Sequence, residues 1–361
     1  MKLDQPHRIL FPVALLLGAA IAPLKLLELQ GDLFASLPPG WHGHEMILGM
    51  ATAIIAGYLL PARRPGLLAG LLLAWLIARL VVLLPVANPA AVMAGLSLWP
   101  LLMGAVTANR FLKGAKTARN LVFAPILLGF LPAELLYTAG ITDWLPGGTE
   151  AGLALGAGLV LLMLFTMGGR IIAAASSGAH QRIGGRLHRA AQPRLEALGL
   201  GLILLLTLAL MTDAPLLLTS AAALAAGLVV MLRLAYWRVW RLLCQREVAL
   251  LHLGYGWLAA GLVFAGWAIH TGRMPGLSAL HPALIGGFGT LAVVMMVRTT
   301  LQRARRPLAM TALPMLAVAL LALAGVARGL AAVTGDMTAM GLSAAAWTLG
   351  LLIALIVLAR V

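Results

Sequence analysis

The sequence Trp41-His42-Gly43-His44-Glu45-Met46 opens an apolar run that continues from Ile47 to Leu60. It places two imidazoles, a carboxylate and a thioether at the start of a segment long enough to enter a lipid bilayer. Such groups are costly to bury in a membrane unless they are paired, protonated or metal-bound, so they indicate a functional site. The stretch therefore marks both a membrane helix and the candidate site around which other helices are expected to pack.

The composition of the whole chain agrees with a membrane location. Of the 361 residues, 62% are hydrophobic and 10% are charged, whereas about a quarter of residues are charged in soluble domains. The net charge of +15 comes from short loops between apolar runs, where basic residues orient the chain. We therefore expect the lipid bilayer, and no nucleic acid, as a partner. The single cysteine, Cys244, excludes an internal disulfide and a CxxCH haem attachment.

A helix that spans a bilayer needs about 20 apolar residues. Twelve segments meet this criterion: 9–29, 42–61, 66–84, 90–108, 119–139, 150–172, 194–212, 214–235, 248–271, 277–299, 308–330 and 339–360. The first is expected to remain as a helix, because no clear signal-peptide cleavage site follows it. The predicted fold class is all-α, a polytopic integral membrane protein with about 12 transmembrane helices.

The distribution of basic residues predicts the orientation of these helices. All but four of the 26 Lys and Arg residues lie in or beside loops on one membrane face, so the positive-inside rule places both termini in the cytoplasm. We expect a single membrane domain, 1–361. The basic cytoplasmic loop 173–193 would join two candidate halves, 1–172 and 194–361, and its histidines, His180 and His188, are expected to be solvated.

With this orientation, half of the histidines lie at the outer membrane face. These four are His42, His44, His270 and His281. The turn between His270 and His281 contains glycine and proline, which permits a tight hairpin. The helices that carry these histidines are expected to touch at their outer ends. His252 precedes His270 by five helical turns, about 27 Å, and is predicted to lie near the inner face.

Helical phase leaves two interpretations of the first stretch. At 3.6 residues per turn, His42, Glu45 and Met46 share a face while His44 points away. Either His42 alone is a ligand and His44 is an interfacial residue, or the start of the helix frays and both imidazoles are used.

The residue types indicate which ligands such a site would take. Imidazole suits copper, iron and haem iron, and thioether favours Cu(I). The predicted metal ligands are His42, His44, Glu45, Met46 and His281. The predicted cofactor-binding residues are His42, His44, His252, His270, His281 and Arg79. Arg79 has three interpretations: its side chain extends to the outer interface, pairs with Glu134, or holds an anion such as a haem propionate.

Several stretches together resemble the NnrS family of polytopic bacterial membrane proteins. They are Trp41–Met46 with Ile55–Leu60, Trp75 with Arg79, Gly168–Ile172, Leu251–Trp257, and Leu280–Leu284 leading to Met296 and Arg298. Two departures lie at the predicted inner face. A Pro-Phe-Phe type sequence is replaced by Ala173–Ala175, and a Gly-His-Thr-Gly stretch is replaced by Thr299–Gln302.

The resemblance implies a function as well as a fold. It implies a haem b- and copper-containing protein of the bacterial inner membrane, associated with nitric oxide metabolism and protection against nitrosative stress. From the residues alone, a different class stays open: a secondary transporter in which buried Glu45, Glu134 and Arg79 relay protons or anions. No residue pattern identifies a catalytic cycle.

Overall fold

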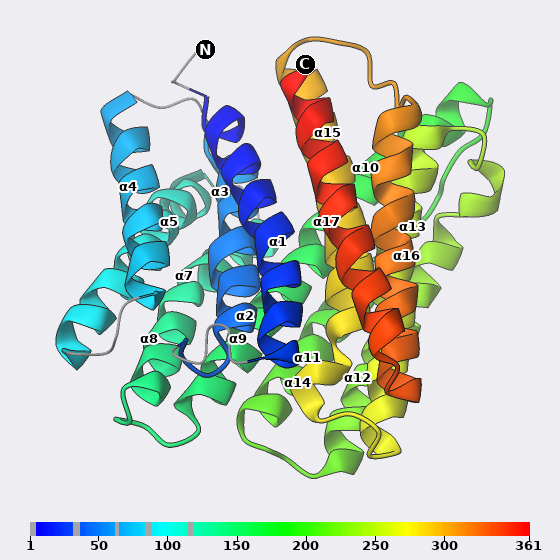
Figure 1. The fold of residues 1–361 in the computed structure, drawn as a ribbon. Coiled ribbons are helices and arrows are strands. Elements are labelled where there is room, and N and C mark those ends of the chain that lie inside the picture. The colour runs from blue at the N-terminus through cyan, green and yellow to red at the C-terminus, as the bar shows by residue number, and fades with distance from the viewer. Residues whose placement is uncertain (1–4, 32–36, 62–64, 84–87, 115–117) are drawn as a thin grey trace. The chain divides into compact units, whose positions relative to one another are not determined.

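The computed structural model describes residues 5–31, 37–61, 65–83, 88–114 and 118–361. Every regular element in these ranges is a helix, and eleven helices are long and apolar enough to cross a membrane (Figure 1). The prediction of an all-α polytopic membrane protein is confirmed. The eleven coincide with eleven of the twelve expected spans, and the difference lies at segment 42–61.

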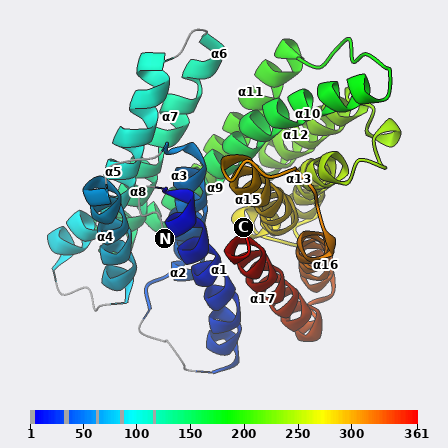
Figure 2. The same cartoon turned by 90° about the horizontal axis from the view of Figure 1, so that it is seen from above.

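The chain divides into two compact units, residues 1–160 and 161–361. The first unit contains α1 (His7–Gln30), α2 (Trp41–His44), η1 (Glu45–Ala51), α3 (Thr52–Leu59), α4 (Pro65–Val82), α5 (Pro89–Gly114), α6 (Ala118–Leu121), α7 (Phe123–Leu128), α8 (Phe130–Ile141) and most of α9 (Gly148–Met163). Helix α1 packs against η1 and α3, and α5 packs against α4, α7 and α8. The view from above shows α4 beside α5 (Figure 2).

Segment 42–61 is helical but broken into three parts, α2, η1 and α3. Its middle part, Glu45–Ala51, is a π-helix. This is the segment that opens with the two histidines, and no part alone is long enough to count as a span. The interruption displaces side chains from the 3.6-residue periodicity on which the predicted helical phase rests.

The second unit is also entirely helical in its described residues. It contains η2 (Leu164–Gly168), α10 (Gly169–Arg182), α11 (Pro193–Met211), α12 (Leu216–Tyr236), η3 (Val239–Arg241), α13 (Arg246–His270), α14 (Gly276–Ala279), η4 (Ala283–Gly289), α15 (Thr290–Arg303), α16 (Ala312–Thr334) and α17 (Met337–Ala359). Helix α13 packs against α12, η4 and α15. Helices α16 and α17 lie side by side as a hairpin (Figure 1).

The prediction of a loop over residues 173–193 is wrong for the first half of that range. Helix α10 continues to Arg182, because Ala173–Ala175 are strong helix formers. The chain leaves the helix at Gly184, whose φ of +74° favours glycine. His180 is consequently buried, and its Nε2 lies 3.3 Å from the carbonyl oxygen of Trp237. The expectation that it is solvated is wrong, whereas His188 is exposed as predicted.

In the part of the chain that the structure describes, three π-helical segments interrupt the helices: η1, η2 and η4. Each overlaps or adjoins a stretch that the sequence singled out, namely Trp41–Met46, Gly168–Ile172 and Leu280–Leu284 with the following glycines. Each also has a threonine whose hydroxyl donates to a backbone carbonyl four residues earlier: Thr52, Thr166 and Thr290. Because π-helical turns are rare and are frequent at functional sites, we examined the side chains around them.

Candidate functional site

Four ionisable side chains meet inside the first unit. His44 ends α2, Glu45 begins η1, Arg79 lies on α4 and Glu134 lies on α8. All four are between 0% and 8% exposed. His44 Nδ1 lies 2.9 Å from Glu45 Oε1, and His44 Nε2 lies 2.7 Å from Glu134 Oε1. Arg79 Nε lies 2.8 Å from Glu45 Oε2. We call this set of four residues the His44 network.

The charges of Arg79, Glu45 and Glu134 sum to −1 when all three side chains are ionised. The His44 network is therefore neutral only if it holds one further proton. A neutral imidazole has a single N–H, so contact with two carboxyl groups requires a proton on the second ring nitrogen or on a carboxyl group. With that proton, the charges of Arg79 and the two glutamates sum to zero, as a buried cluster requires. Glu134 Oε2 is buried and has no hydrogen-bond partner among the described residues.

The π-helix η1 positions one end of this network. Trp75 Nε1 donates to the carbonyl of Gly49 at 3.0 Å, and Arg79 Nη1 donates to the carbonyl of Leu48 at 3.4 Å. A methyl group on Gly49 would lie 2.6 Å from Arg79 Nη1, so only glycine leaves room for the guanidinium. The widened turn therefore exposes carbonyls, and two side chains of α4 satisfy them.

One aromatic ring packs directly against the imidazole of His44. Its ring stacks on that of Tyr137 with centroids 4.4 Å apart, and the Tyr137 hydroxyl donates to the carbonyl of Pro39 at 3.2 Å. Trp41 Nε1 donates to Glu28 Oε2 at 2.6 Å, which ties α2 to α1. His44 is fully buried, so the interpretation that makes it an interfacial residue is wrong.

Two of the three roles considered for Arg79 differ from what the structure shows, and the third, holding an anion, stays a prediction. Arg79 is buried rather than extended to the interface, and its carboxylate partner is Glu45, not Glu134. Glu45, the first residue of η1, lies between Arg79 and His44 Nδ1, whereas Glu134 contacts the other ring nitrogen of His44.

The second unit contains a comparable buried arginine, Arg233 on α12. It is 1% exposed. Its Nη1 donates to the carbonyl of Phe165 in η2 at 3.3 Å and to the Tyr255 hydroxyl at 2.9 Å. Its Nε donates to Gln192 Oε1 at 3.3 Å. The guanidinium carbon lies 4.5 Å from the centroid of Phe165 and 5.3 Å from that of Trp237, within range of cation–π attraction.

Arg233 and Arg79 are placed in the same way. Each donates to a carbonyl of a π-helical segment, and each occupies space left by a glycine, because a methyl group on Gly169 would lie 2.6 Å from Arg233 Nη2. They differ in charge balance: Arg79 contacts a carboxylate, whereas Arg233 contacts the neutral groups named above. By the positive-inside count, Arg233 belongs with the basic residues beside the loops. Its position inside the apolar run 214–235 was the signal that could have identified it.

His252 lies in this second unit, away from the His270 end of α13. Its Nδ1 lies 2.8 Å from the carbonyl of Val248, and its Nε2 lies 3.2 Å from Ser176 Oγ. Both ring nitrogens are therefore occupied by protein groups, in an arrangement typical of a structural histidine.

The remaining predicted ligands differ in their surroundings. His281 is half-buried just before η4, and its Nδ1 lies 2.8 Å from the carbonyl of Ser278. His270 is exposed at the end of α13, across the hairpin from α14. His42 and Met46 are half-buried in the first unit, with the His42 ring edge-on to Trp41. The expected approach of His42 or His44 to His270 or His281 stays a prediction.

The histidines differ in whether their surroundings suit a bound metal ion or haem. In the described part of the chain, no three His, Cys, Asp or Glu side chains are grouped as metal ligands would be. His44 does not fit a metal here, because both its nitrogens contact carboxyl groups and a metal needs one nitrogen lone pair. His281 fits: an Nδ1–H bonded to a backbone carbonyl sets the tautomer in which Nε2 accepts, as is usual for metal-bound histidines.

Atoms of neighbouring helices occupy the space beside Gly286 in η4. A methyl group on Gly286 would lie 2.5 Å from the Trp257 ring, and one on Gly325 of α16 would lie 3.1 Å from the Gly286 Cα. The absence of a side chain at Gly286 therefore permits close helix packing.

The fold and the buried charged centres define the class: a polytopic helical membrane protein with ionisable groups in its interior. The chain belongs to the NnrS family, whose model, described as "NnrS protein", matches residues 2–361. This family is linked to the response to nitric oxide. No curated protein matches the chain, and no solved structure matches it.

Proposed function

We propose that this protein acts in the nitric oxide response of the bacterial inner membrane as a haem- or copper-binding membrane protein. Membership of the NnrS family supports the link to nitric oxide. The observation that supports a cofactor is the 2.8 Å contact between His281 Nδ1 and the Ser278 carbonyl, because a proton on Nδ1 makes Nε2 the ring nitrogen that carries the lone pair.

His281 is the residue that we assign as a ligand. His42, His270 and Met46 are the further candidates, since their side chains are half-buried or exposed. A bound haem iron or copper ion would supply the site at which nitric oxide binds. His44, Glu45 and Arg79 are assigned to charge balance and positioning, because His44 and Arg79 both contact Glu45 and Arg79 also donates to the backbone of η1.

The proposal is tested on purified wild-type protein in detergent. An optical spectrum and a metal analysis of the same sample should give a haem absorption band or stoichiometric copper, and the spectrum should change when nitric oxide is added. A sample with neither haem nor copper would refute the proposal. If that sample, in vesicles, supports a gradient-driven flux that Glu134→Gln abolishes, the transporter interpretation replaces it.

A further inference from the structure

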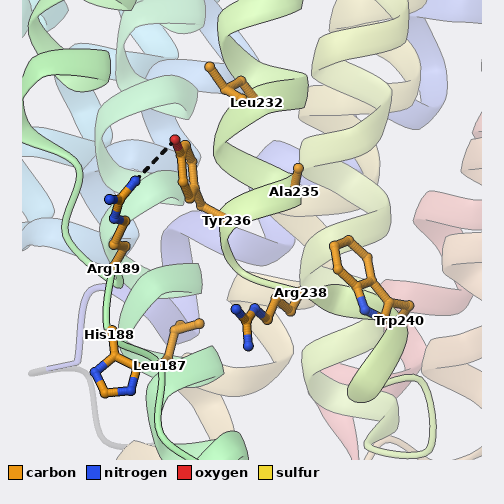
Figure 3. A pocket seen from close by; sticks show the side chains of 8 residues that line it. All are labelled: Leu187, His188, Arg189, Leu232, Ala235, Tyr236, Arg238 and Trp240. Carbon is orange, nitrogen blue, oxygen red and sulfur yellow. Dashed lines mark hydrogen bonds between the residues drawn. The ribbon is translucent and has the colours of Figure 1, made fainter.

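A cavity of about 410 Å³ lies at the end of α12 in the second unit. It is bounded by the turn that follows α12 and by the chain around His188 (Figure 3). Its wall contains three basic side chains, those of His188, Arg189 and Arg238, and no acidic one. An anion would therefore be attracted to this cavity.

The nearby carboxylates are engaged elsewhere. Glu196 pairs with Arg170 at 3.0 Å, and Glu247 pairs with Arg182 at 3.2 Å. Across the described ranges, neither Arg189 nor Arg238 has a carboxylate within the 4.0 Å of an ion pair. Their positive charge is thus not compensated by the protein.

The side chain of Arg189 is held in place before any ligand binds. Arg189 donates to the Tyr236 hydroxyl at 3.3 Å, and its guanidinium carbon lies 5.4 Å from the centroid of that ring. Trp237 Nε1 donates to the carbonyl of Ala190 at 3.0 Å, which ties this segment to the end of α12. Arg238 has a φ of +50°, a left-handed conformation that is costly for a residue with a side chain. Figure 3 shows its guanidinium between His188 and Trp240.

The other walls are apolar and lead along the helix. Leu232 and Trp240 line the cavity and are 45% and 57% exposed. Leu228, one helical turn before Leu232, is 59% exposed, so the two leucines form an apolar strip on the same side of α12. A basic cavity at the end of an apolar strip on a membrane helix matches a phosphate headgroup with its acyl chain.

We propose that this cavity binds an anionic phospholipid. The lipid phosphate contacts Arg189 and Arg238, and an acyl chain lies along Leu232 and Leu228. Tyr236 and Trp240 occupy the boundary between headgroup and chain, where aromatic residues are enriched. This inference is independent of the proposed function.

The test is native mass spectrometry of the full chain in detergent with added phosphatidylglycerol or phosphatidylcholine. Wild-type protein should retain phosphatidylglycerol preferentially. Because a basic residue near the membrane surface contributes about 1 kcal/mol, or about fivefold in affinity, the double variant Arg189→Ala/Arg238→Ala should bind about 25-fold less. These side chains are exposed, so the fold should be retained, as a melting curve checks.

The matched control is Arg305→Ala/Arg306→Ala. It removes the same charge from exposed positions, and Arg305 has a left-handed φ of +55° like Arg238. This variant should bind phosphatidylglycerol as the wild type does. Equal loss in both double variants, or no loss in either, would overturn the proposal. Displacement of the lipid by inorganic phosphate at equal concentration would also overturn it, since the cavity would then recognise free phosphate.

Discussion

His44 Nε2 lies 2.7 Å from Glu134 Oε1, and both side chains are fully buried. The contact joins residues 90 positions apart and connects α2 to α8. Together with Glu45 and Arg79, it forms a buried chain of alternating basic and acidic groups.

Removing the imidazole from this network should destabilise the protein strongly. In His44→Ala, Glu45 and Glu134 lose the group that separates them, and a buried charge left without its partner costs about 3–5 kcal/mol. We expect a clearly lower melting temperature in detergent. Glu134→Gln is the milder comparison, because the amide keeps the size and an oxygen acceptor. A melting temperature of His44→Ala equal to that of the wild type would show that the network is not formed.

Gly49 should be intolerant of even a methyl group. In Gly49→Ala the added carbon would meet Arg79 Nη1 at 2.6 Å, and overpacking of this kind costs about 1–3 kcal/mol. The control is Gly70→Ala in α4, where nothing lies within 4 Å of the added carbon and alanine favours the helix. Thermal unfolding should show a loss only in the first variant, and equal melting temperatures would contradict this account of η1.

Gly169 and Arg233 should be energetically coupled. Gly169→Ala places a methyl group 2.6 Å from Arg233 Nη2, so it should lower the melting temperature in the wild-type background. In the Arg233→Met background, where the shorter apolar chain can move aside, the same change should cost little. A double-mutant cycle measures this coupling, which reaches about 0.5–3 kcal/mol for residues in contact. Additive effects would show that the two positions are independent.

The predicted orientation is tested by reporter fusions. Fusions after Asp143, Asp336 and Ser36, the last of which lies outside the described residues, should report the outside. Fusions after Lys113 and His188 should report the cytoplasm, because the basic residues collect beside these positions. A reversed result at any two of these sites would mean that the helix order or the orientation must be redrawn.

Sequence patterns predicted most of the fold because membrane helices depend mainly on local composition. Eleven apolar runs correspond to eleven helices, each identified by length alone. Segment 42–61 was located, but its π-helical turn was not, since periodicity arguments assume 3.6 residues per turn. The extension of α10 to Arg182 was missed because polar residues such as Ser176 and His180 resemble a loop in composition, although both are buried.

The candidate site was predicted in part. Glu45, Glu134 and Arg79 were identified because charged groups in apolar runs need partners. Which groups pair could not be predicted, because contacts such as His44–Glu134 depend on how distant helices pack. Arg233 was overlooked because it lies close enough to a helix end to be counted as an interfacial residue.

The proposed role of His281 as a ligand of haem or copper is tested by measuring the bound haem and copper per protein in His281→Ala. We expect this variant to lose most of the cofactor found in the wild type, since an absent imidazole leaves a coordination position that the backbone does not fill. His188→Ala, at an exposed position, should retain all of it. Full retention of haem and copper in His281→Ala would contradict the account.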